Sequence, residues 1–238
     1  MEDLMCNYGG FLPLSMVDYP SHSACVVFLR GCPGRCPNCI NKDLQDGKNM
    51  VSTEWVLDRI DEAAKFVSAV VISGGECLMQ SEAVQYIAAY SQDIGLKVGI
   101  ETAGLFPESL ESVLPHVDRV LLSIKCKLNN VEYMTAMGVT MQWTGLVNFA
   151  GRVQKCLDVL DSWDGEVEFI TPIFQPDIEC MRHAIVDLDN HISSPRTWKL
   201  VPGLYPNKEQ KPISKVELRA LASSINSYLA KSNIKVIT

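Results

Sequence analysis

Short apolar runs alternate with longer amphipathic segments along most of this chain. Ala24 to Arg30 is a continuous apolar run rich in Val and Phe, and similar runs follow at intervals. Such runs are typical of strands that are buried on both faces of a sheet. The pattern predicts six such strands and a short final one, at residues 24–30, 69–72, 96–100, 119–124, 167–171, 198–201 and 234–237.

Between these runs, apolar residues recur at helical spacing. A helix capped by Ser52 or Thr53 is expected to reach Phe66, and Ser214-x-x-Glu217 is a capping box that opens the last helix. Further helices are expected at residues 82–90, 107–114, 146–160 and 178–188. The least regular stretch runs from Cys126 to Gly145.

Strands that alternate with helices in this way indicate right-handed βαβ units on a mostly parallel sheet. Six repeats are too few for a complete eight-stranded barrel. The sequence therefore predicts an α/β fold, a partial (β/α)6 barrel, formed as a single domain over residues 1–238.

Three cysteines, Cys32, Cys36 and Cys39, lie at C-x3-C-x2-C spacing in the segment 31–41, which we call the cysteine loop. Its Gly and Pro residues exclude a regular helix or strand. Three thiolates are one short of a structural zinc site and of the usual iron–sulfur cluster with four cysteine ligands. A cluster held by three cysteines keeps one iron open for chemistry. A zinc site with a distant fourth ligand, or an accidental group of buried thiols, remains an alternative.

Polar residues follow the next three predicted strands, where parallel α/β folds place their active sites. They are Gly74, Gly75 and Glu76, then Glu101 and Thr102, then Ser123 and Lys125. A pair of glycines lets the backbone come close to a ligand. The competing interpretations are a structural turn at Gly74–Glu76 and a solvated lysine at Lys125.

The cysteine loop resembles the cluster-binding signature of radical S-adenosylmethionine (SAM) enzymes. Asp18-Tyr19-Pro20 and the run from Ala24 to Cys32 look most like the activating-enzyme branch, whose members generate glycyl radicals. The resemblance implies that Cys32, Cys36 and Cys39 hold a 4Fe–4S cluster whose open iron is chelated by SAM. It also implies that Gly74–Glu76 binds the SAM amino group.

The remaining motifs match the activating enzymes with departures. Glu101-Thr102-Ala103-Gly104 resembles their Asp-Thr-Asn-Gly, and Ser123-Ile124-Lys125 resembles their Asp-x-Lys, in which Lys125 would pair with the SAM carboxylate. Ser123 cannot supply the carboxylate charge of that Asp. Asn38 replaces an aromatic residue, and Cys77 replaces a proline. Cys77 and Cys126 are interpreted as small buried hydrophobes, with extra ligands or redox thiols as the alternative.

The resemblance implies an oxidoreductase that cleaves SAM reductively to a 5′-deoxyadenosyl radical. The expected substrate is a glycine of an anaerobic ribonucleotide reductase, with flavodoxin or ferredoxin as electron donor. One alternative is a radical SAM enzyme acting on a small molecule, similar to 7-carboxy-7-deazaguanine synthase. Outside catalysis, the alternatives are an iron–sulfur electron carrier and a zinc-stabilised binding module.

Composition narrows the possible binding partners and the cellular compartment of the protein. A net charge of −7 argues against a general nucleic-acid binder. Nine cysteines in 238 residues suit a reducing compartment, and no signal peptide or membrane-spanning run is recognisable. We therefore expect a cytoplasmic protein. The four histidines show no metal-ligand spacing among themselves.

Overall fold

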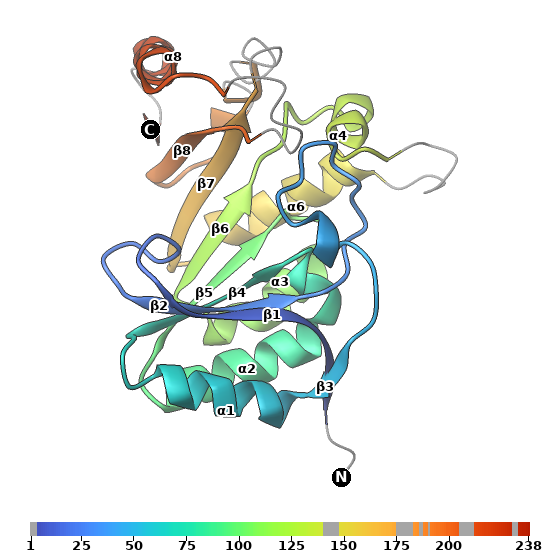
Figure 1. Ribbon diagram of the computed structural model, residues 1–238. Coiled ribbons are helices and arrows are strands. Elements are labelled where there is room, and N and C mark those ends of the chain that lie inside the picture. Colours follow the sequence, from blue (N-terminus) through green and yellow to red (C-terminus); the bar gives the residue numbers. More distant parts are fainter. Residues whose placement is uncertain are drawn as a thin grey trace. The chain divides into compact units, whose positions relative to one another are not determined.

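The computed structural model describes residues 4–139, 148–174, 183–185, 188–189, 191–204, 212–229 and 233–238 (Figure 1). The chain divides into two compact units. The first unit comprises Met1–Pro33, Asn41–Thr102 and Phe106–Leu121, and the second comprises Gly34–Ile40, Ala103–Leu105 and Leu122–Thr238. The prediction of a single domain over residues 1–238 stays a prediction.

The first unit is an α/β layer in which the strands follow the order β3-β1-β2-β4-β5-β6. Strand β2 pairs with β4, and β4 with β5, in parallel, whereas β1 is antiparallel to both β2 and β3. Helices α1 and α2 pack side by side against this sheet (Figure 1). The strands are β1 (Met5–Ser15), β2 (Ala24–Leu29), β3 (Met50–Ser52), β4 (Ala69–Gly74), β5 (Lys97–Thr102) and β6 (Arg119–Ser123). The helices are α1 (Thr53–Ala63), α2 (Ser81–Asp93) and α3 (Pro107–Val113), with 3-10 turns η1 (Lys42–Leu44), η2 (Cys77–Gln80) and η3 (Leu114–His116).

Apart from the short segments 34–40 and 103–105, the second unit runs from Leu122, within β6, and contains strands in the order β7-β8-β9. Both pairings, β7 with β8 and β8 with β9, are parallel. The buried side chains of Phe169 and Trp198 meet edge to face between neighbouring strands, with ring centroids 5.7 Å apart. The elements are α4 (Asn130–Ala136), α6 (Phe149–Asp161), β7 (Glu166–Ile173), β8 (Arg196–Pro202), α8 (Lys215–Tyr228) and β9 (Ile234–Ile237).

The mostly parallel α/β sheet is confirmed, with three differences in the elements. Strands β1 and β3 were not expected, helix α1 ends at Ala63 instead of Phe66, and α4 lies inside the stretch that was predicted to be irregular. The predicted capping box is present, because Ser214 accepts from the Glu217 backbone while the Glu217 side chain accepts from Ser214. Most of the predicted helix 178–188 lies outside the described residues.

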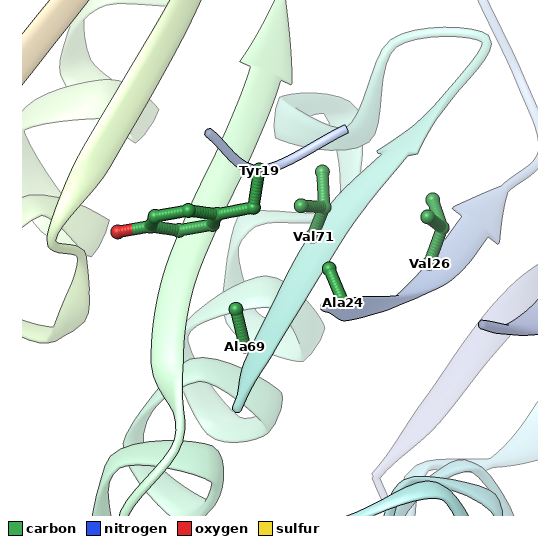
Figure 2. Close-up of a cluster of buried hydrophobic side chains, with 5 residues drawn as sticks. All are labelled: Tyr19, Ala24, Val26, Ala69 and Val71. Carbon is green, nitrogen blue, oxygen red and sulfur yellow. The ribbon is translucent and has the colours of Figure 1, made fainter. Parts of the chain in front are cut away.

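Tyr19 fills the core at the amino-terminal ends of the parallel strands in the first unit. Its ring packs with Ala24, Val26, Ala69 and Val71, and Figure 2 shows these five side chains together. The buried Arg119 guanidinium, at the start of β6, lies 5.6 Å from the ring centroid. The Asp18-Tyr19-Pro20 segment is therefore packed at the start of β2, and the cysteine loop follows that strand's other end.

In the part of the chain that the structure describes, no helix combines the length and the apolar character needed to cross a membrane.

Candidate functional site

The cysteine loop and the Gly74–Glu76 turn meet at the carboxyl ends of two neighbouring strands. Parallel pairing places Leu29, at the end of β2, opposite Gly74 at the end of β4. Beyond the ladder, the Gly75 N–H donates to the Leu29 carbonyl at 3.0 Å, and the Glu76 N–H donates to the Gly31 carbonyl at 2.8 Å. The turn is thus bonded directly to the residue that precedes Cys32.

Two further backbone bonds hold the start of the loop in the first unit. The Gly31 N–H donates to the Leu44 carbonyl at 2.7 Å, and the Cys32 N–H donates to the Gln45 carbonyl at 3.1 Å. The Asn41 side-chain amide donates to the Gly74 carbonyl at 3.0 Å, which ties the far end of the loop to the same turn. The start of the cysteine loop, at Gly31 and Cys32, and its end, at Asn41, are therefore both fixed to the first unit by hydrogen bonds.

The glycines of the turn are required by contacts within the chain. Gly74 has a φ of +137°, and a Cβ there would lie 2.0 Å from the Leu29 carbonyl oxygen. A Cβ on Gly75 would lie 2.4 Å from the Gly31 carbonyl oxygen. The sequence alone suggested that these glycines make room for a ligand. The structure adds that they make room for the backbone leading into the cysteine loop.

The predicted acidic residues lie at the ends of β4 and β5, and their carboxylates accept hydrogen bonds from the protein. Glu76 is 1% exposed and accepts from the Thr102 hydroxyl at 2.7 Å and from the Leu78 N–H at 3.3 Å. The Glu101 carboxylate accepts from the Ser73 hydroxyl at 2.7 Å. Buried carboxylates need such partners. The fold therefore pairs Glu76 with Thr102 and Glu101 with Ser73 at the ends of these strands.

Cys77 lies close to both of these carboxylates. Its thiol is fully buried and donates to the Glu101 carbonyl at 3.3 Å. Burial, followed by the nearby charges of Glu76 and Glu101, raises the pKa of the Cys77 thiol well above its usual value. Cys126 is also buried, and its thiol donates to the Lys127 carbonyl at 3.4 Å. Both observations favour a packing role for these thiols.

In the second unit, the predicted residues Ser123 and Lys125 are connected through Tyr133 on α4. The Lys125 N–H donates to the Tyr133 hydroxyl, which in turn donates to the Ser123 carbonyl, both at 3.4 Å. Burial raises the pKa of the Cys36 thiol, and the Lys125 ammonium lies close enough to lower it in part. Within this unit, Lys125 therefore lies near Cys36, and Ser123 is linked to Lys125 through Tyr133.

Sequence reasoning missed Tyr133 and the turn Met137–Gly138, which contact these residues. The signal was present, since Asn129 caps the first turn of α4 by accepting from the Val131 and Glu132 N–H groups. Gly138, just past the end of α4, has a φ of +65°, as is typical of a helix stop. A short helix between these two signals was not recognised inside the stretch 126–145.

The described cysteines differ in their exposure to solvent, and this difference fits cluster ligation by the cysteine loop. Cys32, in the first unit, and Cys36 and Cys39, in the second, are partly exposed. The other described cysteines are buried, namely Cys6, Cys25, Cys77, Cys126 and Cys156. Among the residues that the structure describes, no three His, Cys, Asp or Glu side chains are gathered closely enough to hold a metal ion. Three accessible thiols are nevertheless the donor chemistry that an iron–sulfur cluster requires.

Comparisons with known proteins bear on the same residues. Residues 26–127, which include the cysteine loop and every other predicted site residue, match the model of the Radical SAM superfamily. The protein MJ1227 of Methanocaldococcus jannaschii, which carries the name of a putative glycyl-radical enzyme activating enzyme, is 37% identical over 126 residues, 52% of this chain and 52% of that protein. A pyruvate formate-lyase-activating enzyme of Clostridium pasteurianum is 34% identical over 118 residues, 47% of this chain and 49% of the relative. The chain thus spans about half the length of these curated relatives.

The fold is shared more widely than the sequence. The crystal structure of QueE from Escherichia coli is similar with a TM-score of 0.57 at 15% identity, over 98% of this chain and 94% of that one. This likeness confirms the predicted fold class, an α/β fold with a mostly parallel sheet of the partial-barrel type.

Proposed function

We propose that this chain generates a glycyl radical on a partner enzyme, because residues 26–127 match the model of the Radical SAM superfamily and the chain is similar to glycyl-radical enzyme activating enzymes. The observation that carries this proposal is the hydrogen-bonded junction between Gly31, next to Cys32, and Glu76 in the Gly74–Glu76 turn. It joins the two most specific motifs of the sequence at one strand end. An electron carrier or a zinc module has no need of this arrangement.

In this proposal Cys32, Cys36 and Cys39 hold a 4Fe–4S cluster. When bound, the cluster and SAM supply an electron and a 5′-deoxyadenosyl radical that abstracts hydrogen from the substrate. The protein residues bind and orient the two cofactors. The backbone of Gly74–Glu76 accepts from the SAM amino group, and Lys125 pairs with the SAM carboxylate.

The hydrogen bonds of Glu76 and Glu101 at the ends of β4 and β5 have a supporting role in this proposal. Glu76 holds Thr102 and the first turn of η2, and Glu101 holds Ser73. These bonds fix the backbone that faces SAM before it binds, which lowers the entropy lost on binding. Ser123 contributes a neutral side chain where the activating enzymes carry a carboxylate.

The substrate is a backbone glycine of a glycyl-radical enzyme, and the finer proposal is an anaerobic ribonucleotide reductase. A flavodoxin or a ferredoxin would deliver the electron. Similarity to the Methanocaldococcus protein and to the Clostridium pyruvate formate-lyase-activating enzyme supports the reaction type. The choice of ribonucleotide reductase is tested directly by offering both kinds of partner.

The experiment mixes the reduced, cluster-loaded protein with SAM and either an anaerobic ribonucleotide reductase or a pyruvate formate-lyase, and records electron paramagnetic resonance spectra. We expect a doublet from a glycyl radical on the reductase, absent when its radical glycine is replaced by alanine. Cys36→Ala, which removes a cluster ligand, should give no radical. Turnover of a small-molecule substrate without either partner would contradict the proposal.

A further inference from the structure

The carboxyl end of α4 contacts the part of the cysteine loop that lies between its first two cysteines. Both segments belong to the second unit. The Arg35 N–H donates to the Met137 carbonyl at 2.6 Å, and the Cys36 thiol lies 3.7 Å from the Met137 thioether sulfur. The loop is therefore held here by a helix far from it in sequence, through both backbone and side chain.

Gly138 makes the backbone contact possible. A Cβ on this residue would lie 2.0 Å from the Arg35 carbonyl oxygen and 2.6 Å from its carbonyl carbon. Backbone atoms cannot move aside as cheaply as the end of a side chain. Any residue other than glycine at this position would push the Arg35–Cys36 peptide away from α4.

We propose that the turn Met137–Gly138 is a positioning element for Cys36. Its backbone sets where the Arg35–Cys36 peptide lies, and the Met137 thioether covers the Cys36 sulfur. The turn thereby orients a cluster ligand and protects it from solvent and from thiol reagents. The statement about the ligand rests on the proposed function, whereas the contact with the Cys36 thiol can be tested in the protein without a cluster.

The backbone contact is tested by Gly138→Ala against the matched control Gly95→Ala. Gly95 follows the end of α2 with a φ of +87°, and a Cβ there would meet no atom within 4 Å. Both variants carry the strain of a left-handed alanine, so this strain cancels in the comparison, but only Gly138→Ala displaces the loop. After anaerobic reconstitution we expect Gly138→Ala to lose about half or more of its cluster iron, with an altered spectrum of the reduced cluster, while Gly95→Ala matches the wild type.

The side-chain contact is tested in the apoprotein by the rate at which iodoacetamide alkylates Cys36, measured by peptide mass spectrometry with Cys39 as internal reference. Met137→Ala should raise the Cys36 rate about threefold or more, because the covering group is gone. Met137→Leu, which keeps the volume, should restore the wild-type rate. Met134→Ala, which truncates a buried side chain in the same helix, controls for loss of helix stability.

The outcomes separate this inference from the proposed function. If the wild-type protein holds no cluster but Met137→Ala still exposes Cys36, the proposed function fails and the contact stands. If the wild type holds a cluster and Gly138→Ala loads as well as Gly95→Ala, the positioning role is overturned. Equal acceleration of Cys36 alkylation in Met134→Ala and Met137→Ala would also overturn it, because general loosening of α4 would then explain the effect.

Discussion

At Gly75, the space that a side chain would need is filled by two backbone carbonyl groups, that of Gly31 in the cysteine loop and that of Leu44. A Cβ would lie 2.4 Å from the Gly31 oxygen and 3.0 Å from the Leu44 oxygen. We expect Gly75→Ala to lower the free energy of unfolding by about 1–3 kcal/mol, the usual cost of overpacking, and to reduce cluster loading. Urea unfolding and iron analysis measure the two effects.

The matched control for this prediction is Gly10→Ala in β1. A Cβ at Gly10 would make only an ordinary contact, at 3.8 Å from a ring carbon of Phe28. The free energy of unfolding of this variant should lie within about 1 kcal/mol of the wild-type value, and the variant should load a full cluster. Equal stability of the two variants would mean that the turn and the loop are not tightly packed in solution.

Cys77 and Cys36 provide a second comparison at the residue scale. The Cys77 thiol is buried and its raised pKa keeps it protonated at neutral pH, which makes it a poor ligand and a poor nucleophile. We expect Cys77→Ala to retain the full iron content at a cost in stability of about 1–2 kcal/mol, and Cys36→Ala to lose the cluster. Loss of iron in Cys77→Ala without loss of fold would assign Cys77 to the cluster site instead.

At the scale of elements, the apolar runs located the buried parallel strands, most clearly β2 and β4, which are almost continuously apolar. This pattern missed β1, whose sequence contains Gly9, Gly10 and Pro13, residues that disfavour strands in isolation. Pairing with β2 overrides that preference, and the close approach of the Phe28 carbonyl, 3.0 Å from where a Gly9 Cβ would be, explains one of the glycines. The missed features therefore depend on tertiary contacts that local patterns do not encode.

The same distinction applies to the candidate site. Cys32 was singled out by the spacing of the three cysteines, and Gly75 and Glu101 because residues at parallel strand ends gather at one edge of a sheet. The contacts of Cys36 with Met137 and of Arg35 with the Met137 carbonyl join segments distant in sequence, so no spacing rule points to them. Only the cap at Asn129 and the stop at Gly138 marked the helix that supplies these contacts.

The starts of β5 and β6 are tied by Asp118, which leads to a pH-dependent prediction. Its carboxylate accepts from the Lys97 ammonium at 2.7 Å and from the Val98 N–H at 2.8 Å. Burial alone would raise the pKa of Asp118, but these hydrogen bonds outweigh it and the pKa is lowered. The stabilisation is therefore complete above the unfolded-state pKa of about 3.9 and is lost as the pH falls through the lower folded-state pKa.

We expect Asp118→Asn to reduce the stability at pH 7 by about 1 kcal/mol, a value that allows for solvent screening of this partly exposed pair. The difference from the wild type should shrink as the pH is lowered below about 4. Urea unfolding of both proteins at a series of pH values measures it. A difference that stays constant with pH would show that the contribution comes from packing and not from the carboxylate charge.

At the scale of the whole molecule, the cysteine loop passes from the first unit into the second between Pro33 and Gly34 and returns after Ile40. A ligand that binds the folded chain and not the unfolded one stabilises it by mass action. Metal binding is also coupled to folding, because the unfolded chain does not hold the thiolates of the cysteine loop together. Loading the cluster should therefore raise the melting temperature of the chain.

We expect anaerobic reconstitution to raise the melting temperature of the wild type by about 5 °C or more. The melting temperature is measured by circular dichroism in sealed cells. Cys36→Ala should show no such rise, because one of the three proposed ligands is missing. Cys25→Ala changes a buried thiol in β2. As apoprotein it should have a lower melting temperature than the wild type, yet cluster loading should raise its melting temperature by the same amount as in the wild type. An equal rise in Cys36→Ala would place the iron elsewhere on the chain, since a cluster bound through the cysteine loop cannot stabilise a protein that has lost one of its three ligands to the same extent.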